Sequence, residues 1–171
     1  MSLGIYVHVP FCLSKCPYCD FYSVVSRDGD LKEKFTDRLA REIREGAEIP
    51  WFFKSKPDTL YLGGGTPGLL ESDQLERIVT AVGDAFGGDE LKEITIEVNP
   101  GSTDLEKLKD FRAIGFNRLS IGVQSFDDQV LRRLGRLHRA EDCFRVYEDA
   151  RQAGFENVSL DLMFGIDGQT A

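Results

Sequence analysis

Short apolar runs alternate with longer amphipathic segments along nearly the whole chain of 171 residues. The runs have the length of strands, and the segments between them repeat apolar residues with the helical period. The expected strands are residues 4–9, 58–63, 92–98, 117–123 and 156–164, and the expected helices are residues 31–45, 73–86, 104–114, 127–135 and 141–153. This alternation predicts parallel strands joined by crossover helices, which is an α/β fold.

The number of strands limits how much of a barrel the chain can form. A closed (β/α) barrel takes about 250 residues, so five strands in a chain of this length predict a partial barrel with parallel strands. Residues 160–165 resemble a buried strand that runs into a loop, with no helix after it. We therefore expect residues 1–171 to be the N-terminal part of a core domain, with the remainder of the barrel and a C-terminal domain absent from this chain.

Several residues are placed to begin or end the helices. Thr103 with Glu106 fits a capping box, and Asp30 is positioned to cap the first helix. Glycines stand where helices are expected to end, at positions 46, 87, 115 and 154.

Composition excludes several classes of protein. A hydrophobic content of 42% is enough to bury a core, and a net charge of −8 with a pI near 4.8 provides no basic surface for nucleic acid. No segment reaches the roughly 20 apolar residues that span a bilayer. Three of the four cysteines are crowded near the start and Cys143 is remote, which does not fit a secreted disulfide framework. We expect a cytoplasmic protein with Cys143 in its core.

The crowded cysteines, Cys12, Cys16 and Cys19, directly follow the first apolar run. Thiolates at gaps of four and three residues can hold one side of an iron–sulfur cluster. Three ligands on a four-iron cluster leave one iron open to a second molecule. The alternative is a closed zinc site made by the same cysteines with His8.

Polar residues follow each expected strand, where parallel α/β folds bind their ligands. They are the three cysteines, the run Gly63-Gly64-Gly65-Thr66-Pro67, the run Glu97-Val98-Asn99-Pro100, the pair Gln124-Ser125, and Asp161. Thiolates, exposed backbone, carboxylates and an amide together suit an amino acid joined to a nucleoside.

The glycine run has a second interpretation. Gly63, Gly65 and Gly68 fit the dinucleotide pattern G-x-G-x-x-G after a strand, although Pro67 and the residues after it delay the next helix. A dinucleotide-binding oxidoreductase therefore remains an alternative. A P-loop does not, because the Gly-Lys-Ser/Thr ending is missing.

Taken together, these motifs resemble the radical S-adenosylmethionine (SAM) superfamily, in the branch of oxygen-independent coproporphyrinogen III oxidase and its haem-chaperone relatives. The resemblance runs from Tyr6 to Thr170. It is carried by residues 6–12, 16–21, 63–67, 97–100, 121–125 and 160–162.

The resemblance implies a 4Fe-4S cluster on Cys12, Cys16 and Cys19, with SAM on the open iron. Reductive cleavage of SAM would give methionine and a 5′-deoxyadenosyl radical, so an enzyme is favoured. The implied cofactor-binding residues are Tyr6, Tyr18, Gly64, Gly65, Thr66, Glu97, Gln124, Arg136 and Asp161. Arg136 is expected to pair with a carboxylate through two parallel hydrogen bonds. Glu97 or Asp161 is expected to pair with the cationic groups of the cofactor. The implied partners are haem or a porphyrin, and an electron donor protein.

Two positions depart from the pattern of the family: Phe21 from the oxidases and Asp167 from the relatives in general. Phe21 stands where the oxidases carry a further cysteine, which favours the haem-chaperone branch over porphyrinogen decarboxylation. Asp167 replaces a common proline, which removes a ring constraint from its loop.

Other conspicuous residues have simpler interpretations. Residues 51–53, Trp-Phe-Phe, are expected to pack between the first helix and the second strand. Arg132, Arg133 and Arg139 are expected on a solvated helix face, and His138 at the surface without a partner.

Overall fold

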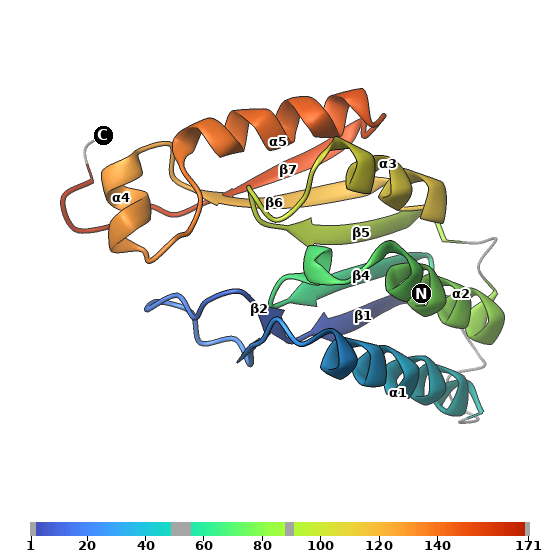
Figure 1. Cartoon of the computed structure of the whole chain (residues 1–171). Coiled ribbons are helices and arrows are strands. Elements are labelled where there is room, and N and C mark those ends of the chain that lie inside the picture. The colour runs from blue at the N-terminus through green and yellow to red at the C-terminus, as the bar shows by residue number, and fades with distance from the viewer. Residues whose placement is uncertain (1–2, 49–55, 88–90, 170–171) are drawn as a thin grey trace.

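The computed structural model describes residues 3–48, 56–87 and 91–169. Its centre is a five-stranded parallel sheet with the spatial order β1-β4-β5-β6-β7 (Figure 1). The strands are Gly4–Val9 (β1), Thr59–Gly64 (β4), Glu93–Val98 (β5), Arg118–Gln124 (β6) and Asn157–Leu162 (β7). Each of these strands pairs with the next one along the chain, so the sheet winds in one direction, as in a (β/α) barrel. All five predicted strands are confirmed.

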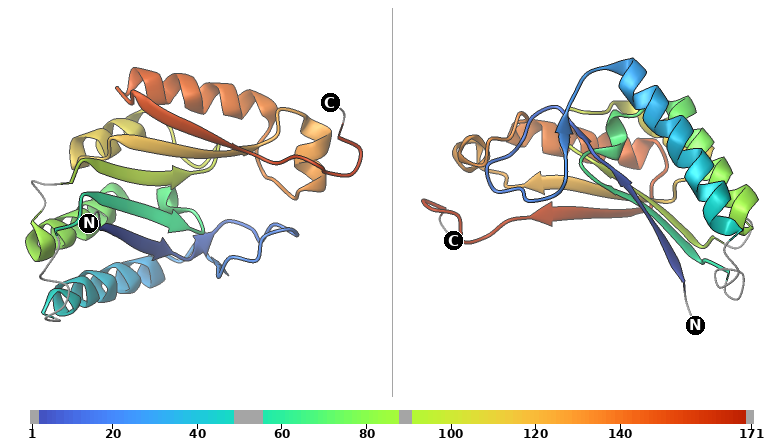
Figure 2. Two further views of the ribbon diagram at one scale, coloured as in Figure 1. Left: turned by 180° about the vertical axis from the view of Figure 1, so that it is seen from behind. Right: turned by 90° about the horizontal axis from the view of Figure 1, so that it is seen from below.

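Four helices cover one face of this sheet (Figure 2). They are α1 (Gly29–Ala47), α2 (Ser72–Phe86), α3 (Leu105–Ile114) and α5 (Ala140–Gln152). Helix α1 packs on α2, α2 contacts α3, and α3 contacts α5, so the four form one layer. A fifth short helix, α4 (Asp128–Arg133), follows β6. The five predicted helices are confirmed.

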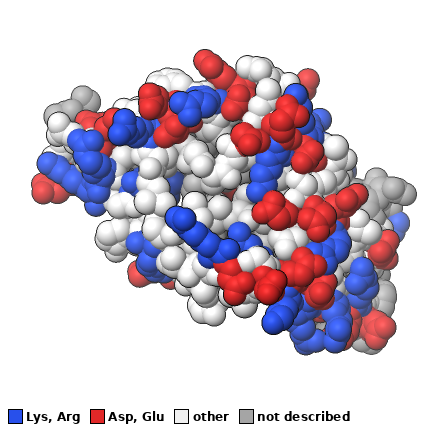
Figure 3. Space-filling model, viewed as in Figure 1, with Lys and Arg blue, Asp and Glu red and all other residues white. Residues whose placement is uncertain are grey.

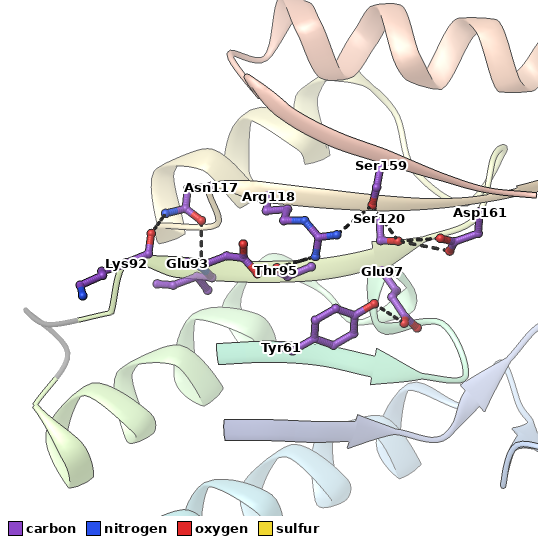
Figure 4. A network of polar contacts seen from close by, with 11 residues as sticks. Tyr61, Lys92, Glu93, Thr95, Glu97, Asn117, Arg118, Ser120, Ser159 and Asp161 are labelled. Carbon is purple, nitrogen blue, oxygen red and sulfur yellow. Dashed lines mark hydrogen bonds and ion pairs between the residues drawn. The ribbon is translucent and has the colours of Figure 1, made fainter. Parts of the chain in front are cut away.

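The two faces of the sheet have opposite chemistry because side chains alternate along a strand. The face under the helices is apolar and buried, with Val7, Val9, Leu60, Leu62, Ile96, Val98, Leu119, Ile121 and Val123 in the hydrophobic core. The other face is polar, and Figure 4 shows side chains of β4 to β7 that meet on it. Arg118 donates hydrogen bonds to Thr95 and Ser159 there, at 3.4 and 3.2 Å.

Strands β1 and β7 are the two edges of the sheet and do not pair with each other, which confirms the open, partial barrel. The prediction of a buried last strand is wrong for the described residues. Leu160 and Leu162 on β7 are 38% and 57% exposed, and Phe164, beyond the strand end, is 92% exposed. The reason is the edge position, since no described strand pairs with the free edge of β7.

Both predicted N-terminal caps are wrong by one or two residues. Helix α1 is capped by Asp28, whose carboxylate accepts from two backbone N–H groups of the first turn, so Asp30 lies inside the helix. Helix α3 is capped by Asp104, and the expected Thr103–Glu106 box is not formed. The cap is the last extended residue before the helix, and in each case an aspartate occupies it.

The predicted C-terminal glycines are mostly confirmed. Gly87, Gly115 and Gly154 have positive φ at or just after helix ends, whereas Gly46 lies within α1. The aromatic residues 51–53 lie outside the described residues.

None of the described helices has the length and apolar character to cross a membrane. Acidic and basic side chains are mixed over the face shown in Figure 3, with no continuous basic surface there. The exclusion of nucleic acid stays a prediction.

Candidate cofactor site

A cavity of about 540 Å³ lies at the carboxyl ends of the parallel strands. Its volume is in the range of pockets that bind molecules the size of a nucleoside. The predicted residues that line it are Cys12, Cys16, Cys19, Tyr18, Gly64, Gly65, Thr66, Glu97, Gln124, Arg136 and Asp161. Segments far apart in sequence therefore contribute to one site, as expected where parallel strands end together.

Tyr6 is a predicted site residue that does not line this cavity. It lies on the polar face of β1 and is 58% exposed. Its ring stacks on Tyr61 with 6.0 Å between centroids, and its hydroxyl lies 3.2 Å from Nδ1 of His8. Burial, together with the nearby charge of Glu97, raises the pKa of Tyr6. A role for Tyr6 beside the cofactor stays a prediction.

The cysteines lie on a loop whose two ends are paired. Strand β2 (Phe11–Cys12) pairs in parallel with β3 (Val24–Val25). Within the loop, Nζ of Lys15 donates to the carbonyl of Phe21 at 2.8 Å, and Nε2 of His8 lies 2.8 Å from the carbonyl of Tyr22. These contacts fold the loop back onto the end of β1, next to the cavity.

The three thiols form a soft donor set, which suits an iron–sulfur cluster. Cys12, Cys16 and Cys19 are free thiols that border one cavity. In the described part of the chain, no three His, Cys, Asp or Glu side chains are arranged to hold one metal ion. The His8 ring is engaged by Tyr6 and Tyr22 and does not line the cavity, which weakens the hypothesis of a zinc site that includes His8.

A chain of polar contacts joins two of the cysteines. Nη1 of Arg136 lies 3.9 Å from Sγ of Cys16, and the Thr66 hydroxyl lies 4.0 Å from Sγ of Cys12. Asn99 connects them, because its Nδ2 donates to Thr66 at 2.8 Å and its Oδ1 accepts from Nη2 of Arg136 at 2.6 Å. Asn99 thus fixes both groups that face thiols. Sequence reasoning placed Asn99 after a strand but gave it no role.

The guanidinium of Arg136 is less free than predicted. Nη2 also donates to the Gly122 carbonyl at 2.7 Å, so that nitrogen is fully used by the protein. Nε is buried and has no hydrogen-bond partner among the described residues. A fork to a ligand carboxylate through both terminal nitrogens would require Nη2 of Arg136 to release either Asn99 or Gly122. Nε cannot serve a ligand instead, because it is buried.

The glycine run serves close packing. A Cβ on Gly65 would lie 2.6 Å from the Phe11 carbonyl oxygen, and one on Gly64 would lie 2.6 Å from the His8 ring. The N–H of Gly65 donates to the Val9 carbonyl at 2.8 Å, and that of Gly64 to Glu97 at 3.1 Å. These two N–H groups are therefore committed within the protein, and the contact of Gly64 and Gly65 with the cofactor stays a prediction.

The dinucleotide alternative is weakened by the same segment. A 3₁₀ helix, η2 (Pro67–Leu69), separates the glycine run from α2. Gly68 packs against Val98, since an added Cβ would lie 2.9 Å from its Cγ1. The glycines therefore do not open the N-terminus of α2 onto a pyrophosphate.

Two carboxylates lie on the polar face of the sheet and reach the cavity (Figure 4). Glu97 accepts a 2.6 Å hydrogen bond from the Tyr61 hydroxyl, and burial together with this bond raises the pKa of Tyr61. Asp161 accepts from the Ser120 hydroxyl at 3.2 Å. Neither carboxylate has a described cationic partner at salt-bridge distance, which leaves negative charge available to a cationic ligand.

Three further residues near the site, His138, Arg133 and Cys143, can be compared with the predictions made for them. The prediction of a surface His138 is wrong: it is buried, lines the cavity, and its Nε2 lies 3.1 Å from the Val123 carbonyl. Burial, with help from the charge of Arg136, lowers the pKa of His138. Arg133 donates to the carbonyl of Asp167, which ties down that loop. Cys143 is buried in the core as predicted.

Comparisons with known proteins agree with this geometry. The chain is 41% identical to the Heme chaperone HemW of Bacillus subtilis over 96% of its length, and 38% identical to the oxygen-independent coproporphyrinogen III oxidase of Salmonella typhimurium over 98%. Its fold matches the coproporphyrinogen III oxidase HemN of Escherichia coli with a TM-score of 0.87 and 36% identity over 99% of the chain. The chain spans 43%, 36% and 38% of these three proteins, respectively.

The profile of the radical SAM superfamily matches residues 6–171, which is nearly the whole chain. Membership in that superfamily implies a 4Fe-4S cluster and SAM. The chain belongs to the radical SAM superfamily.

Proposed function

We propose that this chain is the cluster- and SAM-binding core of a radical SAM protein of the haem-chaperone type. The observation that carries the proposal is one cavity bordered by the three thiols, two carboxylates and Arg136. The identity to the Bacillus subtilis Heme chaperone HemW supports the haem-chaperone branch, as does Phe21 in place of the cysteine expected in oxidases.

In this proposal Cys12, Cys16 and Cys19 hold the cluster. When bound and reduced, it supplies the electron that cleaves SAM. Asn99 holds Arg136 and Thr66 beside the thiols, where their N–H and O–H groups stabilise thiolate charge.

The remaining cavity residues would bind SAM. Glu97 and Asp161 supply negative charge for its amino and sulfonium groups, while Gln124 offers an amide. Tyr18, which lies near Cys16 and Arg136, borders the side of the cavity that the cysteine loop closes. Thr66, Gly64 and Gly65 line the cavity beside Cys12.

A second candidate is the oxidative decarboxylation of coproporphyrinogen III. The similarity to the Salmonella typhimurium oxidase and to HemN favours it, at nearly the same identity. Either function requires a haem or porphyrin partner and an electron donor protein.

Anaerobic reconstitution of the chain with iron and sulfide tests the proposal. We expect about four irons per chain, and an electron paramagnetic resonance (EPR) signal that shifts when SAM is added. Cys16→Ala should lose the cluster, whereas Cys143→Ala, which removes a buried core thiol outside the cavity, should keep it. A zinc-loaded protein without sulfide would reject the proposal.

Haem and porphyrin assays then separate the two candidates. The haem-chaperone function predicts stable binding of haem without formation of protoporphyrinogen. Conversion of coproporphyrinogen III by the reconstituted protein would favour the oxidase.

A further inference from the structure

Strand β6 ends in a strained turn at Gln124. Its φ of 66° lies in the left-handed region, which side chains other than glycine rarely adopt. The N–H of Ser125 donates to the Val123 carbonyl at 2.9 Å, which closes a three-residue γ-turn around Gln124. Such a conformation persists only when the surrounding structure holds it, and it occurs most often at functional sites.

The turn places the Gln124 side chain in the cavity. A Cβ added to Gly122 would lie 3.3 Å from Nε2 of Gln124 and 3.4 Å from Nη2 of Arg136. The amide therefore lies over Gly122, beside Arg136. An ordinary extended residue at position 124 would send its side chain in another direction, because the backbone conformation sets where Cβ points.

His138 contacts this turn from a different segment. Its ring is 7% exposed, and Nε2 lies 3.1 Å from the same Val123 carbonyl that accepts from Ser125. Both lone pairs of that carbonyl are thus used. Since a carbonyl only accepts, Nε2 must carry the proton. On the other side, the Gln124 carbonyl accepts from the N–H of Met163 at 2.9 Å.

We propose that His138 is a positioning residue for the SAM pocket, which acts by clamping the strained turn that aims Gln124 at the ligand. This inference rests on the proposed function, because it concerns the same cavity. Nothing in the contacts of His138 requires it to touch the ligand. Its effect is expected to pass through Gln124.

The test is the SAM affinity of the full chain with its reconstituted cluster, measured at equal iron content by calorimetry and by the EPR shift. His138→Leu removes the donor and should weaken SAM binding about tenfold. His138→Gln keeps an N–H at similar reach and should stay within about threefold of wild type. In a Gln124→Ala background, His138→Leu should cost little more, because the two residues act as one unit.

A merely structural role predicts a different pattern. Equal losses in His138→Gln and His138→Leu, or a full additional loss in the Gln124→Ala background, would overturn the inference. Cys143→Ala is the matched control, since it also perturbs a buried side chain near the start of α5 but does not line the cavity. If His138→Leu does not fold, the SAM affinities of His138→Gln and of the Gln124→Ala, His138→Gln double variant decide. An affinity of His138→Gln close to that of wild type supports the clamp. A loss of affinity in His138→Gln equal to that in Gln124→Ala refutes it. A wild-type chain without a cluster or without SAM binding would instead reject the proposed function.

Discussion

The contacts of Asn99 predict how much of the site depends on one side chain. Asn99→Ala removes the 2.6 Å hydrogen bond from Arg136 and the 2.8 Å bond to Thr66. A hydrogen bond to a charged group contributes about 1.5–3 kcal/mol and a neutral one about 1 kcal/mol. Arg136 keeps its bond to the Gly122 carbonyl, and water can reach this half-buried site. We therefore expect the free energy of unfolding to fall by about 2 kcal/mol.

A matched control exists at the opposite end of the sheet. Asn117 also makes two side-chain bonds, accepting from the Ile94 N–H and donating to the Lys92 carbonyl, both at 2.8 Å (Figure 4). Asn117→Ala should cost a similar amount of stability. Because Asn117 lies away from the thiols, the Asn117→Ala protein should hold as much iron after reconstitution as wild type. The Asn99→Ala protein should hold less.

Asn99→Asp provides a second comparison. The carboxylate keeps an acceptor for Arg136, and the Thr66 hydroxyl can turn to donate to it. We expect a loss of stability below about 1 kcal/mol. The Thr66 hydroxyl would then point away from Cys12, so any change in this variant should appear in the reduction potential of the cluster rather than in stability.

Urea denaturation of the reduced, cluster-free protein measures the differences in stability. Iron analysis after reconstitution measures how much cluster each variant holds. A loss of about 2 kcal/mol corresponds to a fall of roughly 4–8 °C in the melting temperature for a chain of this size. The reasoning fails if Asn99→Ala unfolds at the urea concentration of wild type. It also fails if Asn99→Ala and Asn117→Ala lose the same amount of iron.

Two further predictions concern a glycine and a histidine. Gly65→Ala should destabilise the chain by about 1–3 kcal/mol in urea denaturation, because its Cβ would lie 2.6 Å from the Phe11 carbonyl oxygen. Gly46→Ala has open space around its Cβ in α1 and should stabilise the chain by up to about 1 kcal/mol. Equal effects of the two substitutions would contradict the packing argument. Because the pKa of His138 is lowered in the folded chain, the unfolded chain binds the proton more tightly. The contribution of His138 to stability is therefore present above the unfolded pKa of about 6.5 and is lost as pH falls through the folded pKa. His138→Gln should flatten the pH dependence of the melting temperature, and an unchanged slope would contradict this prediction.

The elements and the position of the site were predictable because both follow from periodicity. Strand and helix bounds shift by only a few residues from expectation, and parallel strands bring their carboxyl ends together whatever their loops do. The polar face of the sheet is also predictable, from the alternation in Leu119-Ser120-Ile121-Gly122-Val123.

The errors concern groups whose partners are distant in sequence. His138 is buried because its segment folds over the end of β6, 15 residues earlier, and nothing local to His138 signals that contact. The bridge through Asn99 depends on the rotamers of Thr66 and Arg136, which lie 33 and 37 residues away. The caps failed for a different reason, since two neighbouring acceptors compete and the backbone selects one.

The site requires the two faces of the sheet to be built differently. The apolar face fixes the strands by packing under α1, α2, α3 and α5, and this allows the opposite face to carry polar side chains. A barrel interior filled with branched apolar side chains would stabilise the sheet but would occupy the space of the cavity. Here that interior carries Glu97, Ser120 and Asp161 instead. Because stability comes from the helix-covered face, substitutions among the polar residues should change ligand binding more than folding, and those in the core should do the reverse.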